Sequence, residues 1–333
     1  MYEKPLQIIS LSSHDLYRKT LEALLKGEVV SSVLQKKSMG SAWGTRERPT
    51  RELRYVNLIL ENPLNRMINA LTFNLTTAVP RTLLSTLLDE INLNVIQFYN
   101  PRAFEFSDDG KSIPTNYGNR IRHFNGYDQL QLVIDQLKED PTTRRAVIHI
   151  HEAGDHVRRY TPCIDCLHFL IRNNTLECQA LWRSKNALSL LPYNLFEFTM
   201  LQELIASELC VPVGRFVQTI TSLHYYLEDQ ERVENIITEL KEKPTPAPMD
   251  KMPFYSLEQI EHIKKLEREL RIDCNGFSQK NELNEYWQHM FDVLKFYVFD
   301  KFQPFEKALS VIENSPWRET ILEKATKVNQ LVN

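Results

Sequence analysis

Apolar positions along the first two thirds of the chain recur at two different spacings, which predict helices and strands. An apolar stripe over 81–91 predicts a helix, and a second stripe from Leu130 to Leu137 predicts another that ends at Asp140-Pro141. Two further helices are predicted over 194–209 and 229–240. Apolar runs with strand-like spacing and turn residues between them predict strands at 55–60, 71–75, 146–151, 167–172, 176–183 and 216–226, with Asn173-Asn174 as a hairpin turn.

The last third of the chain shows helical spacing alone. Residues 241–253 include four prolines, at positions 244, 246, 248 and 253, which predict a stiff linker over 244–253. Beyond the linker, apolar residues again recur at helical intervals. We therefore expect a first domain over 1–243, a Pro-rich linker over 244–253, and a helical C-terminal extension over 254–333.

Composition narrows the classes of function. The 333 residues carry a net charge of −3, so the chain has no general attraction to nucleic acid, and a bound phosphate must meet a local group of arginines. Only nine glycines are present, and none forms a Gly-rich phosphate loop. The sequence has no signal-peptide pattern and no apolar run of membrane-spanning length. We therefore expect a cytoplasmic protein that binds neither membrane nor nucleic acid.

Cys163 is the candidate nucleophile. The five cysteines are odd in number and irregularly spaced, which argues against a disulfide framework. A thiolate that adds to C6 of a pyrimidine makes C5 nucleophilic, and a guanidinium such as that of Arg183 would help to ionise the thiol. The alternatives are a buried structural cysteine or, together with Cys166, a metal or redox site. A zinc site needs about four ligands and no second Cys-x-x-Cys is present, so no metal is expected.

Further polar residues suit a nucleotide. Asn194 can pair with N3–H and O4 of uracil, whereas the same amide, flipped, can pair with cytosine; plain helix capping is the alternative. His224 and Tyr226 alternate on a predicted strand and share one face, which suits a ribose, although a structural histidine is the commoner case. Arg144 and Arg145 could hold a phosphate or form a solvated edge.

The order and spacing of these residues resemble the thymidylate synthase family and its phage hydroxymethylase relatives over about 45–240. The resemblance is most specific from Tyr117 onward, and it is carried by Asn116-Tyr117-Gly118, Asp140-Pro141-x-x-Arg144-Arg145, Pro162-Cys163, Arg183-Ser184, Asn194 and His224-x-Tyr226. It implies an α/β fold, with a large curved mixed sheet flanked by helices, and a homodimer formed through the sheet. It also implies one-carbon transfer to C5 of a pyrimidine nucleoside monophosphate, most of all dUMP, through a covalent Cys163–C6 adduct, with methylenetetrahydrofolate as donor.

The resemblance implies a role for each matching residue. Cys163, Tyr117 and Asn194 belong to the catalytic set, and Asn194 also reads the base. The sugar is held by His224 and Tyr226. The phosphate is held by Arg183 and Ser184 of one subunit together with Arg144 and Arg145 of the partner subunit. A further phosphate-binding arginine is predicted near the N-terminus at Arg48, with Arg46 and Arg51 as rivals.

Other positions depart from the family pattern. Asn186 stands where the family has a folate-contacting aspartate, and Leu190 stands where it has a glycine beside the pterin. The family's catalytic glutamate is predicted at Glu90 with its register open, and Ala103–Phe106 lacks the tryptophan that packs the cofactor. A long helical extension replaces the short C-terminal tail. A methyl or a hydroxymethyl product therefore remains open, and the second hypothesis is a nucleotide-binding sensor or regulator with a degenerate folate site.

Overall fold

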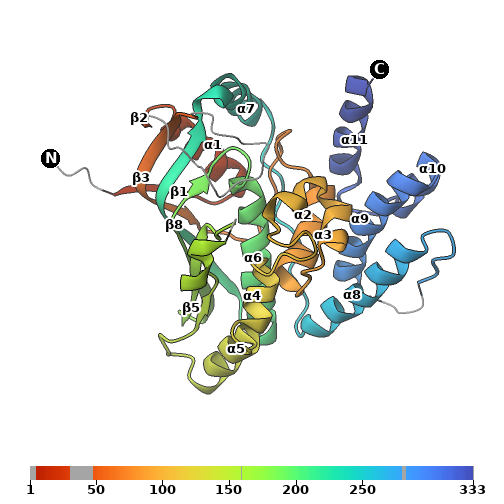
Figure 1. The fold of residues 1–333 in the computed structure, drawn as a ribbon, viewed down its shortest axis with the longest axis horizontal. Coiled ribbons are helices and arrows are strands. Elements are labelled where there is room, and N and C mark those ends of the chain that lie inside the picture. The colour runs from red at the N-terminus through yellow and green to blue at the C-terminus, as the bar shows by residue number, and fades with distance from the viewer. Residues whose placement is uncertain (1–4, 31–47, 159, 280–282, 333) are drawn as a thin grey trace.

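The computed structural model describes residues 5–30, 48–158, 160–279 and 283–332, with side chains placed as far as residue 325. Figure 1 shows a sheet at one side of the molecule, helices packed on it, and the C-terminal helices farthest from it. This mixture of strands and helices confirms the predicted α/β fold class.

The sheet is the scaffold of the molecule. It has eight strands, in the order β1-β3-β8-β6-β5-β4, with β2 attached to β3 and β7 attached to β8. The parallel pairs are β1 with β3, β6 with β8 and β7 with β8, so the sheet is mixed, as predicted. The strands are Leu6–Ser10 (β1), Glu28–Val30 (β2), Thr50–Leu60 (β3), Val147–His149 (β4), Ile164–Arg172 (β5), Thr175–Trp182 (β6), Lys185–Asn186 (β7) and Val213–Tyr226 (β8).

Helix α6 (Leu191–Glu208) lies at the centre of the molecule, between the sheet and the other helices (Figure 1). All but two of its residues are buried, which is typical of a helix that is covered on every side. Its polar members Asn194, Glu197 and Glu203 are therefore buried too. Buried polar groups must find partners inside the protein, so this helix carries an internal polar network.

Two predicted elements differ from the structure. The predicted strand at 71–75 is wrong, because this segment leads into helix α2 (Leu75–Thr82). Asn74 caps that helix through its side-chain oxygen, which accepts a hydrogen bond from the Thr76 amide. The helix predicted over 81–91 begins earlier and passes into a π-helical turn, η1 (Leu83–Leu87), where it ends. The remaining helices of this region are α1 (Ser13–Leu24), α3 (Leu93–Tyr99), α4 (Tyr117–His123), α5 (Gln129–Glu139) and α7 (Gln230–Glu242).

A break in the hydrogen-bonded ladder between β3 and β8 determines which side chains of β8 are buried. The paired register runs from Arg54–Ser222 to Val56–Ile220, and Tyr55 between them has a φ of +56°. On β8 the buried positions shift from even numbers, as at Ile220, to odd numbers, as at Leu223 and Tyr225. This shift leaves His224 and Tyr226 only partly buried, whereas unbroken alternation would have buried both.

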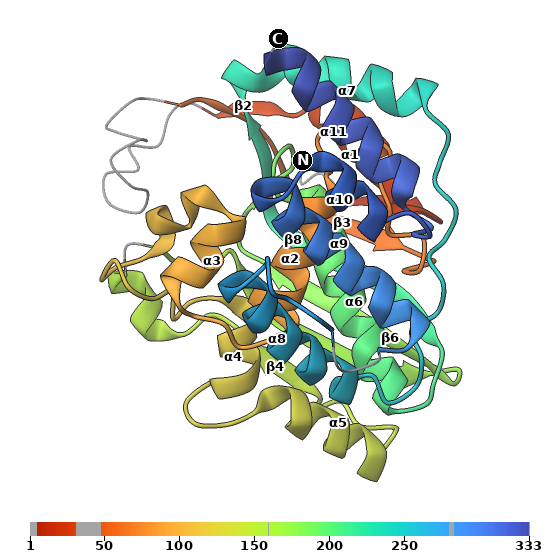
Figure 2. The same ribbon diagram turned by 90° about the vertical axis from the view of Figure 1, so that its right-hand side faces the viewer.

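The C-terminal helices pack on the helical side of the molecule. They are α8 (Leu257–Ile272), α9 (Glu285–Phe302), α10 (Phe305–Val311) and α11 (Arg318–Val332). Figure 2 shows them in front of α2 and α6, on the side away from the sheet. Within the predicted linker, Met249 and Met252 are buried, and their amides donate to Leu64 O and Glu203 Oε1. Met249 and Met252 therefore anchor this segment to Leu64 and to Glu203 of α6.

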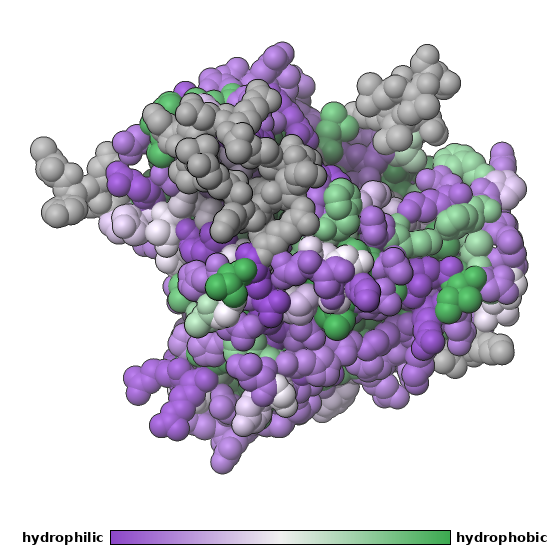
Figure 3. Space-filling view, in the orientation of Figure 1, coloured by the Kyte–Doolittle hydropathy of each residue, from purple (hydrophilic) through white to green (hydrophobic). Residues whose placement is uncertain are grey.

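The face of the molecule in Figure 3 is predominantly polar, with apolar side chains in separate small groups. Among the described residues, no helix is both long and apolar enough to cross a membrane.

Candidate active site

Cys163 and Arg183 lie together where β5 begins and β6 ends. Arg183 Nη2 is 3.8 Å from Cys163 Sγ, and the Arg183 amide donates to Cys163 O. The same guanidinium donates to the carbonyl oxygens of Pro162 and Thr161, each at 2.9 Å. The antiparallel pairing of β5 with β6 thus brings the predicted nucleophile and the predicted phosphate-binding arginine into contact.

The electrostatic surroundings of Cys163 act in two directions. Burial, the largest effect, raises the pKa of the Cys163 thiol, whereas Arg183 and Lys185 oppose that rise. The thiol is therefore protonated at neutral pH, while Arg183 and Lys185 act to favour its thiolate.

Two phenols complete the immediate surroundings of the thiol. Burial, followed by the electrostatic effects of Tyr160 and Cys163, raises the pKa of Tyr117. Burial, followed by Cys163, raises the pKa of Tyr160. Both phenols therefore keep their protons at neutral pH and can donate hydrogen bonds. Tyr117 is a predicted catalytic residue, and the structure places it in this cluster.

A buried polar network surrounds Asn194. Asn194 Oδ1 accepts a hydrogen bond from Lys185 Nζ at 3.1 Å, and Asn194 Nδ2 donates to Glu197 Oε2 at 2.8 Å. Lys185 also donates to Gln218 Oε1 at 2.9 Å and lies 3.0 Å from the centroid of the Trp182 ring. Burial lowers the pKa of Lys185 well below its usual value, whereas Cys163 and Glu197 act to raise it. The predicted base-reading amide is thus held between a buried amine and a buried carboxylate.

Glu197 is anchored from the other side of the network. Its Oε2 accepts from Arg81 Nε at 3.3 Å and from Arg81 Nη2 at 3.2 Å, and its Oε1 accepts from Thr86 Oγ1. Burial acts to lower the pKa of Arg81, but the combined effects of Glu197, Tyr117 and Tyr160 raise it. α2 and η1 therefore contribute directly to the network through Arg81 and Thr86.

Lys185, Glu197 and Arg81 were not among the site residues predicted from the sequence. Glu197 lies three residues after Asn194, so helical geometry places both side chains on one face, and a charged residue within an apolar helix was a usable signal. Arg81 becomes its partner only through tertiary packing, 116 residues away in the chain. Two buried donors of the same cluster, Trp182 Nε1 and Gln218 Nε2, have no hydrogen-bond partner among the described residues, and they could serve a ligand.

The predicted sugar-binding pair adjoins the cluster. Strand β7 pairs Asn186 with His224, and the rings of His224 and Tyr226 lie 5.8 Å apart. The guanidinium of Arg48 lies 3.7 Å from the centroid of the Tyr226 ring and pairs with Glu228. The structure therefore places Arg48 beside the predicted sugar-binding residues. Its rival Arg51 donates to Gly27 O and Gln230 Oε1, and Arg46 lies outside the described residues.

Glu90 lies elsewhere. Its Oε1 accepts from the Asn92 amide, and its side chain lines a groove beneath α8 together with Lys264 and Arg271. Glu197, rather than Glu90, is the carboxylate that the structure brings to the Asn194 amide.

The two folate positions also have local roles. Asn186 Oδ1 accepts from the amides of Leu188 and Ser189, and Leu190 is the residue that precedes α6. The side-chain oxygen of Asn186 is thus occupied by backbone amides, at the position where the resemblance implies a carboxylate.

Arg144 and Arg145 lie at the far edge of the sheet. Both are exposed, just before β4, and neither guanidinium pairs with the part of the chain that the structure describes. His168 hydrogen-bonds with the backbone oxygen of Arg144 and so fixes the path of this segment. Ser184 is partly exposed and follows Arg183. The single chain therefore brings Ser184, but not the two edge arginines, to the Cys163 cluster.

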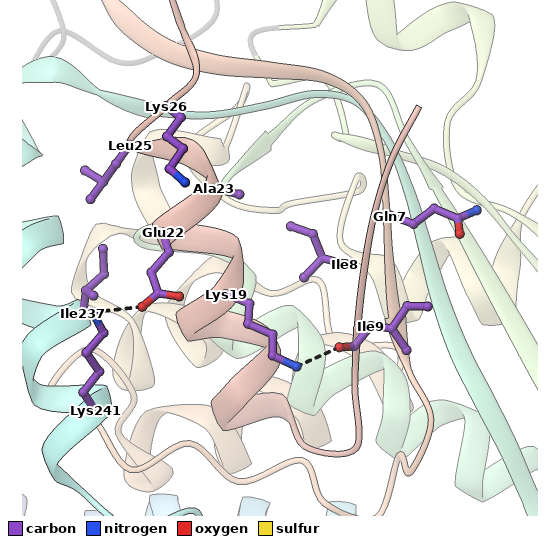
Figure 4. A pocket seen from close by; sticks show the side chains of 10 residues that line it. All are labelled: Gln7, Ile8, Ile9, Lys19, Glu22, Ala23, Leu25, Lys26, Ile237 and Lys241. Atoms are coloured by element: carbon purple, nitrogen blue, oxygen red, sulfur yellow. Dashed lines mark hydrogen bonds and ion pairs between the residues drawn. The ribbon is translucent and has the colours of Figure 1, made fainter. Parts of the chain in front are cut away.

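A recess of about 640 Å³ between β1 and α1 is separate from this cluster (Figure 4). Within it, Lys19 donates to Ile9 O and Lys241 pairs with Glu22. The recess contains none of the predicted site residues. Across the described ranges, no group of three or more His, Cys, Asp or Glu side chains is arranged to hold a metal ion.

Comparison with known proteins defines the class. Residues 81–289, more than half of the chain, match the thymidylate synthase family model, so the chain belongs to the thymidylate synthase family. It is 32% identical over 154 residues to the thymidylate synthase of Mycoplasma pneumoniae, a match that covers 44% of this chain and 53% of that protein. It is 30% identical over 219 residues to the deoxyuridylate hydroxymethyltransferase of Bacillus phage SP01, covering 61% of this chain and 56% of that protein.

A third relative is the putative thymidylate synthase of Methanosarcina mazei, which is 33% identical over 153 residues, covering 45% of this chain and 66% of that protein. The chain thus spans about half to two thirds of the length of these relatives. The modest identities support a divergent family member. The family match also extends past the predicted limit of residue 240 and includes α8.

Proposed function

We propose that the protein transfers a one-carbon unit to C5 of a pyrimidine nucleoside monophosphate, most of all dUMP. The observation that carries the proposal is the contact of Cys163 with Arg183, next to the buried amide of Asn194. A nucleophile, an anion-binding guanidinium and a base-reading amide then lie within one cluster, which is what covalent chemistry on a nucleotide requires.

In the proposed reaction, the Cys163 thiolate forms a bond to C6 of the base. The electron pair of the C5–C6 double bond moves toward C5 and O4, and an N–H of Asn194 stabilises the charge at O4. C5 then attacks a one-carbon electrophile, the C5 proton is lost, and the donor departs from the transferred carbon. Water would add to that carbon for a hydroxymethyl product, whereas the donor would supply a hydride for a methyl product, and the Cys163–C6 bond breaks to release the product. Arg183 holds the phosphate, and His224 and Tyr226 hold the sugar.

Methylenetetrahydrofolate is the proposed one-carbon donor, and the product is either a methyl or a hydroxymethyl nucleotide. Both products stay open, because the matches include thymidylate synthases as well as a deoxyuridylate hydroxymethyltransferase. Mass spectrometry of dUMP and dCMP incubated with the protein and methylenetetrahydrofolate separates the two products. If neither nucleotide gains mass while both bind, the result supports the alternative, a nucleotide-binding sensor.

A homodimer formed through the open face of the sheet is proposed. No described helix covers the face opposite α6 (Figure 1). Partly exposed apolar side chains such as Ile59, Leu170, Leu181 and Val217 alternate with the buried positions of β3, β5, β6 and β8. A dimer through this face would bring Arg144 and Arg145 of the partner subunit toward the phosphate, which is their proposed role.

We further propose that residues 254–333 are a structural extension, joined by 244–253 to a catalytic domain over 1–243. Helix α9 packs on α2, the helix that carries Arg81. The extension therefore contacts the helix that contributes Arg81 to the site. All five cysteines are free thiols, which fits the proposed cytoplasmic location.

A further inference from the structure

We propose that Lys185 and Glu197 fix the orientation of the Asn194 carboxamide and thereby determine which pyrimidine base the site accepts. The inference rests on the proposed function and adds two specificity-determining residues to it. Neither residue belongs to the predicted site.

The two contacts of the amide favour a single orientation. Lys185 donates to Asn194 Oδ1 at 3.1 Å, and the carboxylate of Glu197 accepts from Asn194 Nδ2 at 2.8 Å. A flipped amide would place its oxygen against the carboxylate and its N–H groups against the amine. Both contacts are buried, where unmatched polar groups are costly, so the flipped orientation is disfavoured.

Lys185 acts as a donor whatever its charge. It donates to two oxygens, Asn194 Oδ1 and Gln218 Oε1, and its third neighbour is the electron-rich face of Trp182. An ammonium group donates to both oxygens, and a neutral amine still has two N–H bonds for them. The Asn194 oxygen is therefore held toward Lys185 in either state.

Glu197 acts as an acceptor because it is paired. Arg81 donates two hydrogen bonds to Oε2, and Thr86 occupies Oε1. The Arg81 guanidinium and the Thr86 hydroxyl both donate, so both oxygens of the Glu197 side chain act as acceptors. Both neighbours of the amide are thus fixed by further contacts, and the orientation of Asn194 is set before any nucleotide binds.

A fixed amide distinguishes uracil from cytosine. After these contacts, Asn194 keeps one lone pair on Oδ1 and one N–H on Nδ2. Uracil presents a donor at N3 and an acceptor at position 4, whereas cytosine presents an acceptor at N3 and a donor at position 4. The base whose donor and acceptor face the Asn194 oxygen and N–H, respectively, pairs with the fixed amide. The other base places its donor against the N–H and its acceptor against the oxygen. A freely flipping amide would accept both bases.

The test compares the rate of C5 hydrogen exchange in dUMP and dCMP for wild type, Lys185→Met and Glu197→Gln. The matched control is Glu203→Gln. Glu203 lies on the same helix as Glu197 and is also buried and paired with an arginine, Arg66. Its carboxylate contacts Arg66 and the Met252 amide and does not contact Asn194. We expect the ratio of kcat/KM for the two nucleotides to move toward one by about tenfold or more in both variants, as expected for one lost charge-assisted hydrogen bond. Glu203→Gln should keep the wild-type ratio.

An unchanged ratio in folded Lys185→Met and Glu197→Gln overturns the proposal, as does a wild-type ratio near one. If either variant fails to fold, Thr86→Val removes a single contact of Glu197 and should shift the ratio in the same direction. If wild type exchanges neither nucleotide, the proposed function fails, and the specificity is then read from the dissociation constants of dUMP and dCMP by calorimetry. Equal affinities for the two nucleotides in wild type would overturn the inference by that route.

Discussion

At the scale of single residues, Cys163 is protonated at neutral pH although Arg183 and Lys185 act to lower the pKa of its thiol. Burial outweighs Arg183 and Lys185, so the raised pKa keeps the resting thiol neutral. A bound phosphate and base would change the surroundings of both side chains. Arg183 opposes the rise in the Cys163 pKa most strongly, so substituting Arg183 tests this electrostatic effect directly.

Arg183→Met should make Cys163 less reactive. Removing the guanidinium removes an interaction that lowers the pKa, so the pKa rises further and less thiolate is present at any pH below it. We expect the pH profile of iodoacetamide labelling, read at the Cys163 peptide by mass spectrometry, to shift to higher pH and the rate at pH 8 to fall about threefold or more.

Arg215→Met is the control for this experiment, because Arg215 is an exposed arginine paired with Glu177 on the sheet. It should leave the labelling profile of Cys163 unchanged. A profile that stays the same in Arg183→Met would show that the guanidinium does not act on the thiol.

The site residues differ in how far the sequence could predict them. Cys163, Arg183 and Asn194 were placed in one site by their motifs, and the structure brings Arg183 to Cys163 directly and Asn194 to Cys163 through Lys185. Arg81 and Glu197 were not predicted, because their pairing depends on how α2 packs on α6. The role of each predicted residue remains a prediction.

At the scale of elements, the approach of α4 to η1 depends on Gly118. A Cβ atom at this position would lie 1.5 Å from Leu88 O, which is a backbone atom and cannot move aside easily. Gly118→Ala should therefore reduce the free energy of unfolding by about 2 kcal/mol or more, measured by urea denaturation. It should also displace the neighbouring Tyr117.

Gly154→Ala is the matched control for this experiment, since a Cβ there would meet only a side-chain atom of Glu152 at 4.0 Å. Its free energy of unfolding should stay close to that of wild type. Equal stability of the two variants would mean that α4 and η1 do not approach each other in this way.

The docking of α8 should depend on pH through Asp89. Although burial acts to raise it, the pKa of Asp89 is held at about 2 by Lys264 of α8 and by His123. A lowered pKa in the folded state stabilises the protein above the unfolded value of 3.8, and this contribution is lost as pH falls from about 4 toward 2.

Asp89→Asn should therefore cost roughly 1 kcal/mol of stability at pH 7 and progressively less as pH falls through that range. Urea denaturation at several pH values measures the difference. Asp135→Asn, on the exposed face of α5, should change little at any pH. A cost of Asp89→Asn that does not vary with pH would contradict the assignment of the ion pair.

Long periodic segments were predictable, and short ones were not. The sequence predicted the hairpin of β5 and β6, as well as α6, because their patterns extend over many residues. The segment 71–75 was mistaken for a strand, because a short apolar run does not distinguish a strand from the start of a capped helix. The break in the ladder at Tyr55 depends on a positive φ, which no local pattern indicated.

At the scale of the whole molecule, the open face of the sheet and the exposed edge arginines suggest that one chain does not form a complete site. Mixing Cys163→Ser with an Arg144→Ala/Arg145→Ala variant tests this directly, because each homodimer lacks a component but half of the hybrid sites are complete. After co-refolding at equal amounts, we expect about a quarter of wild-type activity to return. Hybrids that form but stay inactive would contradict shared sites.

The central claim is that Cys163 forms a covalent bond to C6 of a pyrimidine nucleotide. The most direct measurement is loss of deuterium from C5 of dUMP in water, followed by mass spectrometry, with wild type and Cys163→Ala compared at equal nucleotide occupancy. We predict that wild type exchanges the C5 position without any one-carbon donor and that Cys163→Ala does not. Equal exchange by both proteins would contradict the account.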